Sequence, residues 1–159
     1  MRILAVSDSH GYSDTMLKAV ARESPDLILH LGDHDKDCAA IEAKFPEIPL
    51  RSVRGNCDLT STGLIRDQFT LGGKCFFMTH GHHYGVKTGF NDVIEAAASN
   101  GADILLFGHT HTPHYSVQRN MTIINPGSIS IGKGETYAVL ELEDGTVECE
   151  IKKAREQLP

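Results

Sequence analysis

The chain has little of several features that mark common protein classes. It has no tryptophan among its 159 residues, only 6% are aromatic, and no apolar run approaches the ~18 residues of a membrane span. At the N-terminus only Ile3–Val6 is apolar before Asp8, which is too short for a signal peptide. We therefore expect no membrane partner and no export.

Cysteine is scarce and widely spaced. The four cysteines never form a Cys-x-x-Cys pair, which excludes the zinc-ribbon and thioredoxin patterns. They are Cys38, Cys57, Cys75 and Cys149. Because reduced thiols are typical of the cytoplasm, we expect a cytoplasmic protein.

Motifs of several enzyme classes are also missing. The chain has no P-loop, no Gly-x-Gly-x-x-Gly, no His-Glu-x-x-His and no Gly-x-Ser-x-Gly, so phosphotransfer from nucleotides, dinucleotide binding, zincin proteolysis and serine catalysis lack their signatures. Fifteen basic against twenty-one acidic residues give a net charge of −6. This charge argues against a dedicated nucleic-acid binder, because it repels phosphate backbones.

The length predicts one domain over residues 1–159, and the hydropathy pattern predicts an α/β fold. Short apolar runs indicate buried strands at Ile3–Val6, Leu27–Leu31, Leu50–Val53, Cys75–Met78 and Ile104–Phe107. Helical spacing indicates helices at Asp14–Glu23, Asp37–Lys44 and Thr88–Asn100. Hairpins follow Phe107, so we expect two sheets with helices outside them, a hairpin edge open to pairing between copies, and a solvated tail at Lys152–Pro159.

Nine histidines stand out, and five of them lie between positions 80 and 111. Polar residues follow the predicted strands, and parallel strands place such residues along one edge of a sheet. The residues expected to converge there are Asp8, His10, Asp33, Asn56, His80, His109 and His111. Glycines accompany them at the bends, where a residue without Cβ permits sharp turns: Gly32, Gly55, Gly81 and Gly108.

Carboxylate, amide and imidazole ligands without a thiolate suit manganese, iron, zinc or nickel. Seven ligands exceed one tetrahedral site, whereas two ions sharing a carboxylate would use all of them. Two divalent ions would concentrate positive potential at one place on an acidic surface and attract an anion.

In order and spacing these motifs resemble the calcineurin-like metallophosphoesterases, and most closely the small bacterial and archaeal phosphodiesterases. The matching segments are Asp8-Ser9-His10, Gly32-Asp33, Gly55-Asn56, His80-Gly81-His82 and Gly108–His111, followed by Asn125–Ser128. The resemblance implies a four-layer αββα sandwich of two mixed β-sheets flanked by helices. It also implies hydrolysis of a phosphodiester by a hydroxide bound to two ions, for which we expect manganese.

The resemblance assigns Asp8, His10 and His111 to the first ion and Asn56, His80 and His109 to the second, with Asp33 bridging them. Asn56 and His82 are the candidate catalytic residues. Cys57 follows Asn56 where many family members have histidine. Since a thiol is a weaker proton donor, we expect activated or small phosphodiesters as substrates.

Other interpretations stay open at this point. Asp8 and Asp33 could cap helices, and Asn56 could be a turn residue. His30 is expected in the core, and the remaining histidines, His34, His83 and His114, at the surface or rim. Asp35 and Asp37 are expected at a solvated helix start. Asp58, Arg54 and Lys87 could serve the site or the surface alone.

Other functions also remain. A non-catalytic interaction scaffold, as in a retromer subunit of the same fold, is the alternative from another class. A phosphomonoesterase or a nuclease would keep the metal ions and change the substrate.

Overall fold

The computed structural model describes residues 1–155, and its first sheet has the strand order β10-β9-β1-β2-β3. Strands β1 (Arg2–Val6), β2 (Leu27–His30) and β3 (Leu50–Ser52) are parallel. Strands β9 (Thr136–Glu143) and β10 (Thr146–Lys153) add an antiparallel hairpin beside β1. The first sheet is therefore mixed, and its parallel half holds the N-terminal strands.

The second sheet has the order β4-β5-β6-β8-β7. Its centre is parallel, formed by β5 (Lys74–Thr79), β6 (Ile104–Phe107) and β8 (Met121–Asn125). The edge strands β4 (Arg66–Leu71) and β7 (His114–Gln118) run antiparallel to their neighbours. Both sheets are mixed, as predicted.

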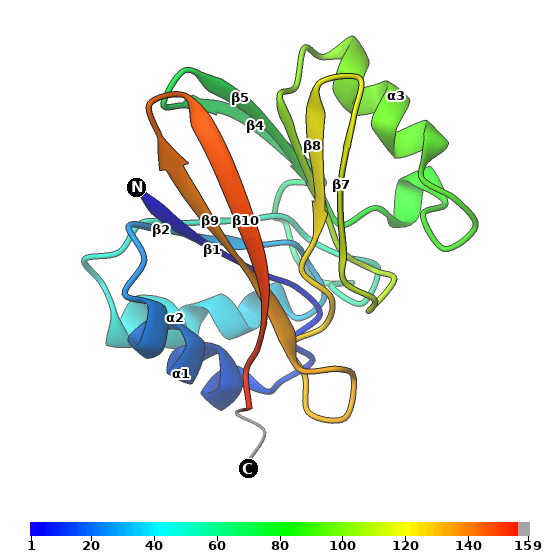
Figure 1. The fold of residues 1–159 in the computed structure, drawn as a ribbon. Helices are drawn as coiled ribbons and strands as arrows, with labels where there is room; N and C mark the ends of the chain where they lie inside the picture. The colour runs from blue at the N-terminus through cyan, green and yellow to red at the C-terminus, as the bar shows by residue number, and fades with distance from the viewer. Residues whose placement is uncertain (156–159) are drawn as a thin grey trace.

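Helices cover the outer face of each sheet (Figure 1). Helix α1 (Ser13–Glu23) and helix α2 (Cys38–Lys44), preceded by the 3₁₀ turn η1 (Asp35–Asp37), pack on the first sheet. Helix α3 (Asn91–Ser99) packs on the second sheet, and the 3₁₀ turn η2 (His82–Tyr84) precedes it in the chain. The helix predicted from Thr88 begins later, because Thr88 closes a turn onto the Gly85 carbonyl.

Three apolar layers stabilise this arrangement. The layer between the sheets contains Ile3, Leu29, Phe76, Met78 and Leu106, all fully buried. One further layer lies under α1 and α2, and another under α3. Burial of a large apolar side chain contributes about 1.5–3 kcal/mol to stability. Each sheet buries one face against the other sheet and one against helices, which gives the four layers α–β–β–α.

The C-terminal end differs in part from the sequence prediction. Strand β10 extends to Lys153, and Ala154 is only 9% exposed, so Lys152–Ala154 do not belong to a solvated tail. The reason is an ion pair in which Lys152 Nζ contacts the buried Glu23 carboxylate at 3.1 Å. The rest of that tail, residues 156–159, lies outside the described residues. Within residues 1–155, no helix has both the length and the apolar character needed to cross a bilayer.

Candidate metal centre

The carboxyl ends of parallel strands from both sheets meet at one edge of the molecule. Strands β1 and β2 are in register there, and so are β5 and β6. The Asp8 N–H donates to the Gly32 carbonyl at 2.9 Å within the first sheet, and the Gly108 N–H donates to the His80 carbonyl at 3.0 Å within the second. The loops that carry the predicted ligands therefore start from one place.

Two groups of potential metal ligands form at this edge. In each group, the nitrogen or carboxylate oxygen atoms that the members offer all lie within 4.8 Å of one another. The first group contains Asp8, His10, Asp33 and His111, and the second contains Asp33, His80 and His109. Asp33 belongs to both. The structure thus brings together six of the seven predicted ligands in two groups that share one carboxylate.

The seventh predicted ligand, Asn56, lies beside the second group. Its Oδ1 is 3.1 Å from His80 Nε2, and His109 Nδ1 is 3.2 Å from the same nitrogen. His80 Nδ1 lies 2.7 Å from the Leu31 carbonyl oxygen and must donate to it, because a carbonyl only accepts. In neutral His80, Nε2 therefore presents a lone pair toward Asn56 and His109.

These contacts fit divalent cations. His10 Nε2 is buried without a hydrogen-bond partner and lies 3.8 Å from Asp8 Oδ1 and 3.8 Å from Asp33 Oδ2. Lone pairs of imidazole nitrogens and carboxylate oxygens point into one small volume, which a cation would satisfy. The orphaned nitrogen is the observation that supports this fit.

The two carboxyl groups are held in the charged form. Burial raises the pKa of Asp8. The hydrogen bond from His111 and the charge of His80 lower it by more than burial raises it, so the pKa lies below its ordinary value. Burial likewise raises the pKa of Asp33, and the hydrogen bond and charge of His80 bring it far below its usual range. Both groups can therefore act as anionic ligands at neutral pH.

The histidines respond in opposite directions. Burial lowers the pKa of His80, but Asp33 and Asp8 raise it above its ordinary value. Burial lowers the pKa of His109, and the charge of His80 lowers it further. A neutral imidazole is the form that binds metal ions, so His109 is ready to bind without releasing a proton.

Five candidate ligands have left-handed backbone conformations. Their φ angles are +55° at Asp8, +47° at His10, +60° at Asp33, +70° at His109 and +59° at His111. Such conformations are uncommon for residues other than glycine and cost on the order of 1–3 kcal/mol each at strained sites. Their concentration in one place indicates a functional constraint on these loops.

Two glycines permit the close approach of the ligand loops. A Cβ on Gly55 would lie 2.6 Å from the backbone nitrogen of Asp33 and closer still to its Oδ1. A Cβ on Gly108 would lie 3.0 Å from Asp8 Oδ2 and would collide with the Ser7 hydroxyl. Side chains at these positions would displace the two buried carboxylates.

Asp58 positions the loops on the first sheet. Its carboxylate accepts hydrogen bonds from the backbone N–H groups of Asp33, Asp35 and Gly55, at 2.9, 3.1 and 2.7 Å. Asp58 is only 8% exposed. Of the two interpretations left open for Asp58, the structure supports the one in which it orients a ligand loop.

Asp37 is not the solvated charge that the sequence suggested. Its Oδ2 accepts from the Ser9 hydroxyl at 2.7 Å and from the Gly11 N–H at 2.8 Å, which braces the segment around His10. The other residue of that prediction, Asp35, accepts a hydrogen bond from Ser61. Helix-capping roles for Asp8 and Asp33 are also absent from the described helices, whose first residues receive no side-chain cap.

The segment Asn125–Ser128 supports the loops from the second sheet. Asn125 Nδ2 donates to the Gly108 carbonyl and to the Thr110 hydroxyl, both at 3.0 Å. The Ser128 and Ser130 hydroxyls donate to the Asp8 carbonyl at 2.9 and 2.6 Å. The sequence indicates Asn125–Ser128 only through a resemblance, because no local pattern reveals contacts between residues this far apart.

The other histidines divide as follows. His30 is fully buried with Nε2 3.0 Å from the Ser9 hydroxyl, which confirms the core prediction. His82 belongs to neither ligand group, and its ring lies 5.4 Å from that of His80 and 6.1 Å from that of His109. Burial and the neighbouring histidines lower the pKa of His82 to about 4. The predicted catalytic role of His82 stays a prediction.

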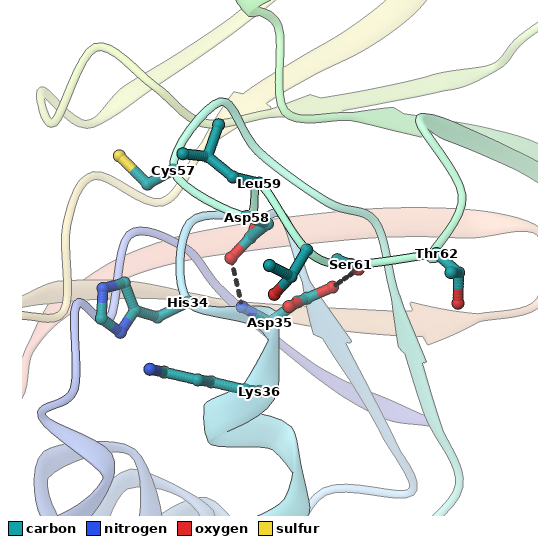
Figure 2. Close-up of a pocket in the computed structure, with 9 residues that line it drawn as sticks. His34, Asp35, Lys36, Cys57, Asp58, Leu59, Ser61 and Thr62 are labelled. Carbon is teal, nitrogen blue, oxygen red and sulfur yellow. Dashed lines mark hydrogen bonds between the residues drawn. The ribbon is translucent and has the colours of Figure 1, made fainter.

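A pocket of about 550 Å³ is lined by the residues that directly follow Asp33 and Asn56 in the chain. Figure 2 shows His34, Lys36, Cys57 and Leu59 around it, with Asp58 bonded to the backbone of Asp35. Arg54 holds the far side of this loop by donating to the Ser61 carbonyl at 2.9 Å. Partial burial and the Asp33 carboxylate raise the pKa of the exposed Cys57 thiol to about 11, so this thiol stays neutral at pH 7.

A second pocket, of about 620 Å³, lies on the side of His109. It is lined by Val86–Phe90, Thr110 and Thr112–His114. Its walls come from the segment before α3 and from the loop between β6 and β7. The metal-ligand groups are therefore flanked by two pockets of a size typical of small-molecule sites.

Comparison with known proteins decides the family. The sequence profile of the calcineurin-like phosphoesterase superfamily domain matches residues 1–145. The chain belongs to this superfamily. It is 36% identical over 152 residues to the probable metallophosphoesterase YsnB of Bacillus subtilis, covering 91% of this chain and 86% of YsnB.

Two further relatives agree with this assignment. The phosphodiesterase YfcE of Escherichia coli is 29% identical, with 92% of this chain and 89% of YfcE covered. A crystal structure of a predicted phosphoesterase from Streptococcus pneumoniae superimposes with a TM-score of 0.80 at 27% identity, covering 96% of this chain and 89% of the other. The predicted family, its small bacterial and archaeal branch, and the fold class are confirmed.

Proposed function

We propose that this phosphoesterase is a phosphodiesterase with two divalent ions. Asp8, His10 and His111 would hold the first ion, and Asn56, His80 and His109 the second. Asp33 would bridge the two. The observation that carries this proposal is that Asp33 is common to two separate ligand groups: its Oδ2 lies 3.8 Å from His10 Nε2 of the first group and 3.5 Å from His80 Nε2 of the second.

The ions, when bound, supply Lewis acidity that activates water and neutralises charge on the phosphoryl group. The chain supplies the geometry. Asp8 and Asp33 stay anionic, and the Leu31 carbonyl orients His80. The buried Asp58 carboxylate accepts the backbone N–H groups of Asp33 and Gly55, which keeps the Asp33 loop fixed. Asn56 is exposed at the edge of the second group, where its amide can donate to a phosphoryl oxygen.

His82 completes the proposed catalytic set. Its ring borders His80 and His109 at the rim of the second group, within reach of a substrate oxygen. Cys57 occupies the place where many relatives have histidine, and its neutral thiol adds no positive charge. We therefore propose small or activated phosphodiesters as substrates and manganese as the cofactor. Because the four cysteines are free and reduced thiols are typical of the cytoplasm, we propose that the protein acts there.

The test combines metal analysis with hydrolysis of bis- and mono-p-nitrophenyl phosphate, with and without Mn²⁺. We expect two ions per chain and manganese-dependent cleavage of the diester in preference to the monoester. Asp33→Asn should abolish cleavage and lower the metal content. Asp92→Asn, at an exposed position in the first turn of α3, is the matched control and should change neither.

Each alternative gives a different result. Preference for the monoester would identify a phosphomonoesterase. Cleavage of single-stranded or duplex nucleic acid at rates comparable to that of the p-nitrophenyl diester would identify a nuclease. A folded protein without turnover in any divalent metal would favour the interaction scaffold and refute the proposal.

A further inference from the structure

The pocket beside His109 contacts the neighbours of two ligands of the second group. Its floor residue Val86 is 2% exposed and packs against Gly81, where a Cβ would lie 3.0 Å from Val86 Cγ2. Gly81 follows His80 in the chain. Thr110, on the opposite wall, lies between His109 and His111. A molecule bound to the ions could therefore extend into this pocket.

One wall of the pocket is aromatic and rigid. The ring of Phe90 lies 4.9 Å from that of Phe107 and 5.0 Å from that of His114, in edge-to-face contacts. The His114 ring is fixed in turn by a 2.8 Å hydrogen bond between Nε2 and the Ser116 hydroxyl. Pro113 packs closely on Gly127, where a Cβ would lie 3.2 Å from Pro113 Cδ. A preformed wall of this kind binds a planar ring at low entropic cost.

The charge of the pocket suits an anionic substrate. No acidic side chain lines it, whereas the pocket beside Asp33 is lined by Asp35 and Asp58 (Figure 2). Lys87 is exposed on its rim, and no ion pair of Lys87 occurs within residues 1–155. On a chain with a net charge of −6, an unpaired ammonium group beside the ligand groups is well placed to attract a phosphate ester.

We propose that this pocket, which we call the Phe90 pocket, holds a planar aromatic or heterocyclic arm of the substrate, with Lys87 facing the phosphate at its mouth. The inference rests on the proposed function, because it requires the phosphoryl group to lie at the ions. It adds a substrate class, namely phosphate esters in which at least one ester group carries a ring. Phe90, Pro113 and His114 contact the ring, and Thr110 and Thr112 line the opening.

The experiment measures affinities of two phosphonates with one arm each, so that no leaving group is involved. Phenylphosphonate and methylphosphonate are titrated into the manganese-containing protein by calorimetry. We expect phenylphosphonate to bind about tenfold more tightly than methylphosphonate, because its ring is removed from water against an apolar wall. Lys87→Met should weaken both ligands to the same extent and leave their ratio unchanged.

Blocking variants locate the ring. Thr112→Trp places a bulky side chain at the exposed opening of the Phe90 pocket and should reduce the preference for phenylphosphonate to about onefold, without weakening methylphosphonate. Thr62→Trp is the matched control at an exposed position in the other pocket and should retain the preference. Thr88→Trp, also exposed in the Phe90 pocket, provides a second block if the first variant does not fold.

The outcomes separate the two proposals. A wild-type protein that binds both phosphonates equally, or a preference lost only in Thr62→Trp, overturns the Phe90 pocket and leaves the metal centre intact. If neither phosphonate binds although the protein cleaves bis-p-nitrophenyl phosphate with manganese, this inference fails and the proposed function stands. If the protein neither binds the phosphonates nor cleaves the diester, both fail.

Discussion

The close approach of Gly55 to Asp33 provides a sharp test of the site, because one methyl group should disable it. Gly55 has no left-handed backbone strain, so Gly55→Ala acts through contact alone. Ordinary contacts of a Cβ begin at 3.4 Å, whereas this Cβ would lie 2.6 Å from the Asp33 nitrogen. The Asp33 loop must therefore move by on the order of 1 Å.

A displacement of that size costs roughly 100-fold in rate when it misplaces a group at the reaction centre, which corresponds to about 2.7 kcal/mol of activation free energy. We expect kcat/KM for bis-p-nitrophenyl phosphate to fall at least by this factor. The free energy of unfolding should fall by about 1–3 kcal/mol, as in other overpacked sites. Circular dichroism and thermal melting establish that the variant is folded before its kinetics are measured.

Gly63→Ala is the matched control for this experiment. It also lacks a left-handed backbone, and the nearest atoms to its Cβ would be the Ser61 hydroxyl at 3.1 Å and the Asp35 carboxylate at 3.3 Å, with Arg54 Cβ at an ordinary contact distance of 3.9 Å. These side chains can move by a few tenths of an ångström, so we expect wild-type activity. A folded Gly55→Ala protein with activity within threefold of wild type would refute the argument that Gly55 sets the position of Asp33.

Three further predictions concern stability and reactivity. Burial raises the pKa of Glu23, but hydrogen bonds from Tyr137 and Lys152 lower it below its ordinary value, so its stabilising contribution is present above pH ~4.3 and is lost as the pH falls through the lowered pKa. Glu23→Gln should therefore cost about 2 kcal/mol at pH 7 and progressively less below pH ~4, as measured by urea unfolding at each pH; a cost independent of pH would contradict this. In metal-free protein the pKa of about 11 leaves Cys57 with on the order of 100-fold less thiolate than an ordinary thiol, so iodoacetamide followed by mass spectrometry should modify it slowly at pH 7 despite its exposure. Leu106→Ala empties part of the layer between the sheets and should lower the free energy of unfolding by about 2–5 kcal/mol while the manganese stoichiometry stays the same.

The sequence predicted the strands that end in the site, because each is a short apolar run followed within two positions by a polar residue. Ile3–Val6 before Asp8 and Ile104–Phe107 before His109 are examples. The start of α3 was predicted less well, because a turn onto the Gly85 carbonyl holds Thr88 outside the helix and delays α3 to Asn91. Local spacing does not report a turn that competes with the helix.

The supporting residues of the site were beyond sequence reasoning. The sequence left the role of Asp58 open and predicted a solvated Asp37, yet each accepts hydrogen bonds from a ligand loop. Ser130 reaches the Asp8 carbonyl across 122 positions. Such contacts depend on how the two sheets pack against each other, and no pattern within one segment of sequence specifies that packing.

The two sheets meet where the Asp8 carboxylate, at the end of β1, accepts the His109 N–H at 3.1 Å beyond the end of β6. Cations bound here would connect two sheets that are otherwise held together by the apolar layer between them and by hydrogen bonds such as this one, so cation binding and folding become thermodynamically linked. At a free ion concentration 100 times the dissociation constant, one bound ion adds about 2.7 kcal/mol to the native state. The melting temperature should accordingly rise with the logarithm of the manganese concentration. On addition of a chelator, the contacts between the two sheets should be lost before those within each sheet.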